Sequence, residues 1–222
     1  MKSSELGAQV WTEVGSPLVV IPVGSFEQHG PHLPLDTDTR IANAVASGLA
    51  TARDDVVIGP SFTVTASGEH AGFPGTLSIG TEVMESALIE LVRSADWAGG
   101  IVFVNGHGGN ITPVESATRR LRREGRRAMS WWPMILGGDA HAGRTETSLM
   151  LAIDPSLVRL DAAEAGSSES LAELMPQLRE VGVRGVSANG VLGDPAGASA
   201  EEGQALLDRL VDDLVLRVAA WA

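Results

Sequence analysis

The fold follows from Leu18-Val19-Val20-Ile21-Pro22-Val23, an apolar run that leads directly into a loop rich in Gly and Pro at residues 24–39. An apolar run of this length that ends in turn residues is typical of a buried strand. Imidazole nitrogens and carboxylate oxygens hold borderline and hard divalent ions, so we interpret the loop as half of a metal site. It holds five side chains of these types: Glu27, His29, His32, Asp36 and Asp38.

A structural role explains part of this loop. Asp is a favourable N-cap, and either Asp36 or Asp38 fits as the cap of a helix that we expect to begin near Thr39. Capping accounts for one carboxylate, however, and gives no reason for Glu27, His29 and His32 to be crowded beside it. We therefore keep the metal interpretation alongside the capping one.

Composition limits the function classes. The chain of 222 residues suits a single domain over 1–222, and it contains no Cys, so any metal must bind to His, Asp or Glu. The N-terminal segment lacks the apolar stretch of a signal peptide, and no run is long enough to span a membrane. We therefore expect a cytoplasmic protein without membrane contact.

The charge balance argues against nucleic acid as a partner. The formal net charge is −12, whereas duplex binding depends on a basic surface. Six of the sixteen basic residues crowd between Arg119 and Arg127. We expect them to form a solvated face at the end of a helix, where they interact favourably with its dipole; an anionic partner is the alternative.

Strands and helices are expected to alternate along the chain. After the first helix, Val56–Ile58 is a second predicted strand, Ile101–Val104 is the clearest central one, and Arg127–Trp132 is another. This alternation predicts a single compact α/β domain with a mostly parallel sheet flanked by helices, and a site at the carboxyl ends of the strands. Further signals predict helix starts capped by Thr81, Thr112 and Ser199, and a helix with Leu171, Leu174 and Leu178 that is interrupted at Pro176.

Three more Gly-rich loops follow predicted strands, at residues 67–76, 105–110 and 137–148. Taken singly, each has a structural alternative: a surface turn, a structural His, or a Glu that complements a helix dipole. All five histidines of the chain nevertheless lie in these loops and the first one. Convergence of the loops at one site is the simplest explanation. Their titratable residues are Glu69, His70, His107, Asp139, His141 and Glu146.

The loops resemble the signatures of the creatininase-like amidohydrolases, over a span from about Val19 to Ile153. The resemblance implies a compact α/β fold, hydrolysis of C–N bonds, a homo-oligomer, and two divalent metal ions per subunit, zinc or iron or manganese. Three motifs carry it: Glu27-Gln28-His29-Gly30-Pro31-His32-Leu33-Pro34 with Asp38; Asn105-Gly106-His107-Gly108-Gly109-Asn110; and His141-Ala142-Gly143 with Glu146-Thr147-Ser148.

The resemblance also implies roles for individual residues. Glu27, Asp38 and His107 would hold one metal, while His29, Glu146 and a bridging Asp38 would hold the other. His141 would act as the catalytic donor or proton carrier, with Glu146 in the catalytic set as well. Glu69, His70 and Arg144 would contact the substrate.

Within the family, the match is closer to members that cleave a modified precursor peptide and release its C-terminal crosslinked dipeptide, derived from Val and Tyr. It extends nearly to the C-terminus, through Gly68-Glu69-His70, Gly75-Thr76 and Gly190-Val191-Leu192-Gly193-Asp194-Pro195. Another amidohydrolase, acting on a small cyclic amide or formamide, would use the same metal loops. A metal-dependent binding subunit without turnover is the remaining alternative.

One position departs from the family pattern. Creatininase itself has a metal-binding Glu two residues after the His of the second motif, where this chain has Gly109. Either the second metal takes another ligand, for which Glu146 is the expected residue, or it is bound weakly. The departure also argues against creatinine as the substrate.

Overall fold

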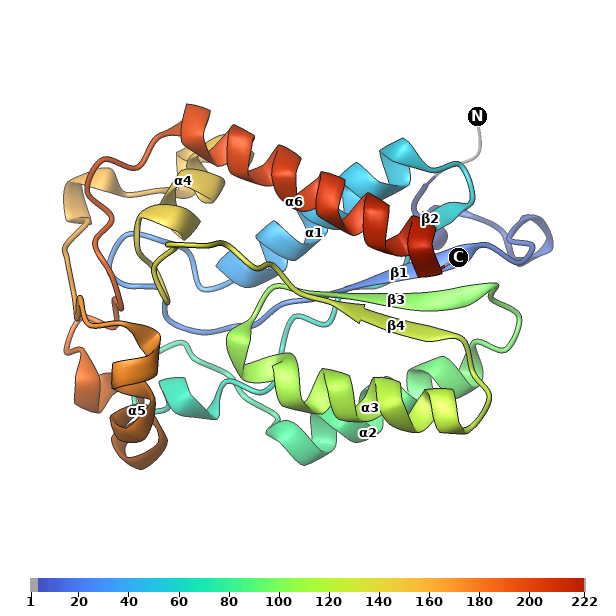
Figure 1. Cartoon of the computed structure of the whole chain (residues 1–222), viewed down its shortest axis with the longest axis horizontal. Coiled ribbons are helices and arrows are strands. Elements are labelled where there is room, and N and C mark those ends of the chain that lie inside the picture. Colours follow the sequence, from blue (N-terminus) through green and yellow to red (C-terminus); the bar gives the residue numbers. More distant parts are fainter. Residues whose placement is uncertain (1–3, 222) are drawn as a thin grey trace.

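The computed structural model describes residues 4–221, and its centre is a parallel sheet of four strands. The strands lie in the order β2-β1-β3-β4, and every neighbouring pair is parallel (Figure 1). Val20 of β1 pairs with Ile58 on one side and with Val102 on the other. The strands are β1 (Leu18–Val23), β2 (Val56–Ile58), β3 (Gly100–Asn105) and β4 (Ala128–Trp131).

Helices cover both faces of the sheet (Figure 1). Because successive strand side chains point to opposite faces, Val20 packs in one core layer with Leu49 and Leu214, while Val19 packs in the other with Leu88. One face is covered by α1 (Thr37–Ala52) and α6 (Ala200–Trp221), and the other by α2 (Thr81–Ser94) and α3 (Ile111–Arg123).

Two further helices lie beyond the sheet, on the side where the strands end (Figure 1). The helix α4 (Arg144–Ile153) packs on α6, and α5 (Leu171–Val186) packs on the 3₁₀ helix η3 (Gly68–His70). A second 3₁₀ helix, η4 (Gly108–Asn110), precedes α3 directly. Within residues 4–221, none of the helices combines the length and hydrophobicity that crossing a membrane requires.

The predicted fold class is confirmed, and the sheet order explains where the site lies. The chain passes from β1 to β2 on one side and then returns to β3 on the other side of β1. The two loops that leave β1 and β3 therefore diverge from neighbouring strand ends, and ligands bind at such a switch point in open α/β sheets.

Several predicted helix ends are wrong. Helix α2 has Gly80 at its N-cap position and α3 has Asn110, so neither Thr81 nor Thr112 caps. Asp36 precedes α1 but makes no cap hydrogen bond, because its carboxylate accepts from Arg40 Nε at 2.8 Å instead. Ser199 Oγ does accept from the Glu202 N–H at 3.2 Å.

The predicted interruption at Pro176 is also wrong. Helix α5 continues through Pro176, and its first turn is held by a capping box between Ser170 and Glu173. The break comes at Gly182, whose φ of +67° is a conformation that favours glycine. A Cβ atom at this position would lie 2.9 Å from the main-chain oxygen of Glu69, so the break lets α5 approach η3 closely.

Candidate metal centre

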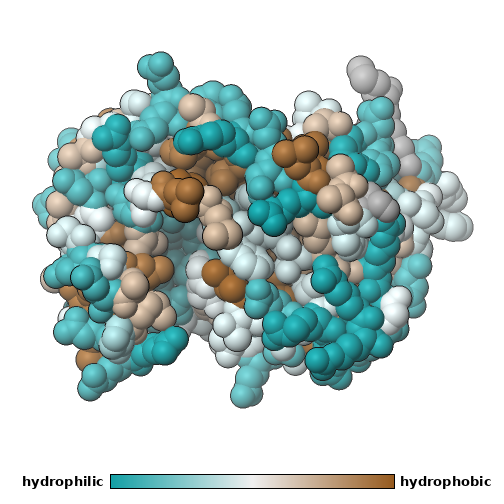
Figure 2. Space-filling view, in the orientation of Figure 1, coloured by the Kyte–Doolittle hydropathy of each residue, from teal (hydrophilic) through white to brown (hydrophobic). Residues whose placement is uncertain are grey.

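Four loops bring the predicted site residues together at the carboxyl ends of the strands. The loop after β1 supplies Glu27 and His29, and the first turn of α1 that follows it supplies Asp38; all three are fully or almost fully buried. Figure 2 shows the surface hollowed on this side of the molecule, between the part that holds α5 and the rest. The other three connections supply Glu69 and His70 after β2, His107 after β3, and, after β4, His141 and the Glu146 of the first turn of α4.

Asp38 lies between two histidines. Its Oδ1 is 3.1 Å from His29 Nε2, and its Oδ2 is 3.1 Å from His107 Nδ1. Ser25 Oγ donates a hydrogen bond of 2.8 Å to the same Oδ2. Asp38 therefore belongs to two groups of potential ligands at once: Glu27, Asp38 and His107, and His29, Asp38 and Glu146.

Three histidines are held from behind by main-chain carbonyls. His29 Nδ1 lies 3.1 Å from the Glu27 oxygen, and His107 Nε2 lies 3.2 Å from the Ala66 oxygen. His141 Nε2 lies 2.9 Å from the Gln28 oxygen. A carbonyl only accepts, so each neutral imidazole donates its single N–H backwards and turns its other nitrogen, as a lone pair, toward the carboxylates.

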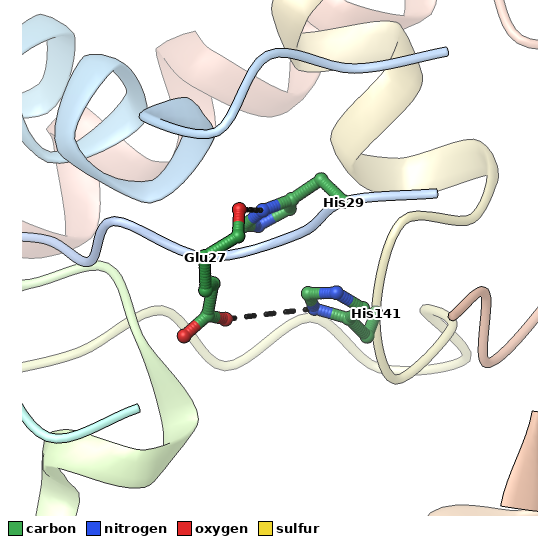
Figure 3. A group of neighbouring side chains, drawn as sticks. All are labelled: Glu27, His29 and His141. Carbon is green, nitrogen blue, oxygen red and sulfur yellow. Dashed lines mark hydrogen bonds and ion pairs between the residues drawn. The ribbon is translucent and has the colours of Figure 1, made fainter. Parts of the chain in front are cut away.

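This arrangement fits a bound cation. Lone pairs that face carboxylates repel them unless a positive charge lies between, and both Glu27 carboxylate oxygens are buried without a hydrogen-bond partner. Figure 3 shows the His29 and His141 imidazoles side by side with the Glu27 carboxylate directed at His141. These three residues form a further group of potential ligands. The donor set of imidazoles and carboxylates suits zinc, iron or manganese.

The electrostatics of the site agree with a bound cation. Burial lowers the pKa of His29, but the carboxylates of Asp38, Glu146 and Glu27 together outweigh burial, and the pKa rises to about 10. Burial likewise opposes the rise for His107, yet Glu27 and Asp38 hold its pKa well above the usual value. Burial raises the pKa of Glu146 to about 7. The raised pKa values show that the site favours positive charge, which a bound cation would also supply.

His141 differs from these two histidines. Burial, followed by the charge of His29, lowers the pKa of His141 to about 4. Its Nδ1 lies 4.0 Å from Glu27 Oε1. At neutral pH it therefore presents an unprotonated nitrogen to the centre, which is the state of a general base.

Other expected residues lie beside the centre. His32 Nε2 is 2.9 Å from Thr147 Oγ1, so it links the first loop to α4. Arg144 is half exposed, and its Nε donates to Glu202 Oε2 at 2.8 Å. Asp139 accepts hydrogen bonds from the main chain of Arg144 and Thr145 and so holds the start of α4.

Glu69 and His70 take different positions. The Glu69 carboxylate is one-third exposed, and its Oε1 lies 3.0 Å from His107 Nε2. His70 is buried, and its Nε2 lies 3.3 Å from Glu27 Oε1. Burial, followed by the charges of His141 and the other histidines, lowers the pKa of His70, so this residue is neutral.

The sequence analysis missed Ser25, Gln28 and the role of the loop at residues 187–195. The main chains of Leu192 and His141 pair with each other, and Gln28 Nε2 donates to the Gly190 oxygen at 3.0 Å. This loop therefore fixes the main chain of His141. Its only sequence signal was the similarity of residues 190–195 to the family members that cleave peptides.

The structure also accounts for Gly109. A Cβ atom there would overlap Glu69 Oε1 and His107 Nε2, and it would lie 2.8 Å from the Ala66 oxygen. No side chain fits at this position. Glu146 instead lies near His29, with Oε2 3.9 Å from His29 Nε2.

Comparison with known proteins identifies the family. The chain is 51% identical to a mycofactocin precursor peptide peptidase of Mycolicibacterium smegmatis, covering 92% of this chain and 85% of the relative. It is 49% identical to another from Mycobacterium ulcerans, covering 98% and 91%. The structure resembles a solved structure of creatininase with manganese, with a TM-score of 0.79 and 25% identity, over 98% of this chain and 98% of that one. The model of the Creatininase family, described as creatinine amidohydrolase, matches residues 4–218, so this chain belongs to the creatininase family.

Proposed function

We propose that this chain is a metal-dependent peptidase that hydrolyses a C–N bond of the mycofactocin precursor peptide and releases a C-terminal crosslinked dipeptide derived from Val and Tyr. The position of Asp38 between His29 and His107 carries the hydrolase part of the proposal. The substrate follows the peptidases to which the chain is similar over nearly its whole length. Creatinine is excluded from the proposal because the chain has no acid at position 109.

The proposed metal sites share Asp38. One ion would be held by Glu27, Asp38 and His107, and the other by His29, Asp38 and Glu146. When bound, such a pair supplies a water of lowered pKa and polarises the carbonyl group of the substrate. Zinc, iron and manganese all suit these ligands.

His141 is the proposed proton carrier. Its Nε2–H is engaged by the Gln28 oxygen, and its Nδ1 faces Glu27 and is unprotonated at neutral pH. We propose that Nδ1 accepts the proton of the attacking water and delivers it to the leaving amine. Glu146 is one-fifth exposed and has a pKa of about 7, so it is a second group that could hold a proton near the substrate.

The three residues proposed to contact the substrate differ in how easily a substrate could reach their side chains. Glu69 is one-third exposed and stays a candidate. Arg144 would reach a peptide carboxylate only by leaving Glu202, and His70 lies buried behind Glu27. We also propose a homo-oligomer, as in the family.

Mass spectrometry tests the proposal. Purified protein of known metal content is incubated with the crosslinked precursor peptide and, separately, with creatinine and small formamides. We expect loss of the C-terminal dipeptide, abolished by a chelator and restored when metal is added back. An intact peptide in the presence of bound metal would overturn the peptidase assignment, and turnover of a formamide would move it to another amidohydrolase.

A further inference from the structure

We infer that Gln28 is a positioning residue that decides which nitrogen of His70 and of His141 carries the proton, and that it thereby keeps His70 out of the set of metal ligands. Gln28 lies between two proposed ligands, Glu27 and His29, but its own side chain points to a different set of partners. It is only 5% exposed, so every hydrogen bond of its amide has to be made within the protein.

The orientation of the Gln28 amide is fixed by Gly30. The Gly30 N–H can only donate, and it lies 2.9 Å from one terminal atom of the side chain, which must therefore be the oxygen Oε1. The other terminal atom is Nε2, with two hydrogens to donate. Three atoms lie within hydrogen-bond distance of it: the Gly190 oxygen at 3.0 Å, His70 Nδ1 at 2.9 Å and His141 Nε2 at 3.1 Å.

Counting hydrogens leaves one consistent network. The Gly190 oxygen can only accept, so it takes one hydrogen of Nε2. His141 Nε2 also faces the main-chain oxygen of Gln28 at 2.9 Å, to which it must donate, so it cannot accept as well. The second hydrogen of the amide therefore goes to His70 Nδ1. If His141 Nε2 accepted instead, its lone pair would face the buried Gln28 main-chain oxygen, and if His70 Nδ1 carried the proton, its N–H would point at the Gln28 amide hydrogens.

The network gives His70 and His141 opposite roles. Because His70 accepts at Nδ1, its proton is on Nε2, where it points at Glu27 Oε1, 3.3 Å away. His70 thus presents an N–H, and not a lone pair, to a metal-binding carboxylate. His141 has its proton on the nitrogen away from the centre, so it offers a lone pair to the same carboxylate from 4.0 Å.

The tautomer of His70 distinguishes one of the four groups of potential ligands found among residues 4–221 from the other three. In three of them the neutral form of every histidine turns a lone pair toward the carboxylates, whereas the neutral form of His70, in the group of Glu27, Glu69 and His70, turns an N–H toward them. A cation cannot bind to a nitrogen that carries a proton. This group is therefore not a third metal position, and His70 acts by orienting Glu27 from outside the ligand set.

A substitution that reverses one hydrogen bond tests the inference. Gln28→Glu keeps the size of the side chain and the oxygen that accepts from Gly30, but it replaces the NH₂ donor with an acceptor. His70 should respond by moving its proton to Nδ1. Gln28→Met removes the donor without supplying an acceptor, so His70 should keep its proton on Nε2. Gln177→Glu adds the same charge at an exposed position and serves as the control.

The readout is the long-range ¹H–¹⁵N correlation spectrum of the histidine rings in the zinc-loaded protein. The chain has only five histidines, and His70→Gln identifies the signals of that ring. We expect an Nε2–H tautomer for His70 in the native protein and in Gln28→Met, and an Nδ1–H tautomer in Gln28→Glu. An Nδ1–H tautomer in the native protein, or no change in Gln28→Glu, would overturn the inference.

Activity gives the second readout, which rests on the proposed function. We expect Gln28→Glu to lower metal affinity and kcat for the precursor peptide by about 10–100-fold, the usual effect of losing an outer-shell partner. Gln177→Glu should leave both unchanged. If the native protein has the expected tautomers but does not cleave the peptide, the proposed function fails and the inference about Gln28 stands.

Discussion

The carboxylate of Glu69 fills the space that a side chain at position 109 would need. Glu69 lies after β2 and Gly109 lies after β3. The side chain of Glu69 therefore occupies the space that an acidic side chain at position 109 would need. Glu69 Oε1 is 3.0 Å from His107 Nε2, the nitrogen that faces away from Asp38 and Glu27. A carboxylate behind a ligating histidine fixes the orientation of its ring and raises its basicity as a ligand.

This relationship predicts different results for two adjacent glycines. Gly109→Ala places a Cβ atom against Glu69, His107 and the Ala66 oxygen, so we expect it to displace His107 and reduce metal affinity about 10–100-fold. Gly108→Ala meets nothing within 4 Å and should leave metal affinity unchanged. Metal titration of both variants measures the difference. Equal affinities would show that the close packing at position 109 does not position His107.

A second prediction compares two acids at the start of α1. Asp38→Asn removes the charge that lies between His29 and His107, so we expect loss of bound metal and of activity. Asp36→Asn affects only a partly exposed contact with Arg40, which contributes about 0–1 kcal/mol. Elemental analysis should find the native metal content in Asp36→Asn and a reduced content in Asp38→Asn. Full metal content in both variants would contradict the bridging role.

Metal binding should release protons. At pH 7 the ion-free protein holds a proton on His29, whose pKa is about 10, and on His107, and it partly protonates Glu146, whose pKa is about 7. A metal ion must displace these protons, so we expect release of about two per chain. The raised pKa of His29 favours the folded ion-free protein most below pH 6.5, and this contribution is lost as the pH rises toward 10.

The apparent metal affinity should therefore increase as the pH rises from about 6 through 7 and beyond. Isothermal titration in buffers of different ionisation enthalpy measures the number of protons released. The Asp36→Asn variant, which leaves the centre intact, should release the same number. A binding enthalpy that is independent of the buffer would contradict the protonation states that we assign.

The sequence predicted the sheet and most of the centre because these features rest on local patterns. Strands β1 and β3 are continuous apolar runs, as buried parallel strands require, and polar residues follow each of them. Parallel strand ends meet at one edge, so Glu27, Asp38 and His107 were expected to lie together without knowledge of any distance.

The sequence could not predict interactions that depend on distant main-chain atoms. Gln28 donates to the oxygen of Gly190, 162 residues away, and this contact gives the loop at residues 187–195 its place beside the centre. The capping predictions at Thr81 and Thr112 failed for a related reason: the residue types fit a cap, but both helices begin earlier, at Thr81 itself and at Ile111. Gly182 was overlooked because Pro176 gave the stronger local signal of a helix break.

A final prediction concerns the coupling of α5 to the centre through Gly182. Gly182→Ala puts a side chain at a positive φ with extended ψ, a region that is essentially restricted to glycine, at a cost of about 1–3 kcal/mol, and it brings the Cβ atom to 2.9 Å from the Glu69 main-chain oxygen. We expect a fall in melting temperature of roughly 2–12 °C and, because Glu69 must move, weaker metal binding. Gly68→Ala, in η3 itself, meets nothing within 4 Å and is the control. If Gly182→Ala lowers the melting temperature but binds metal like the native protein, α5 supports the fold without positioning Glu69 behind His107.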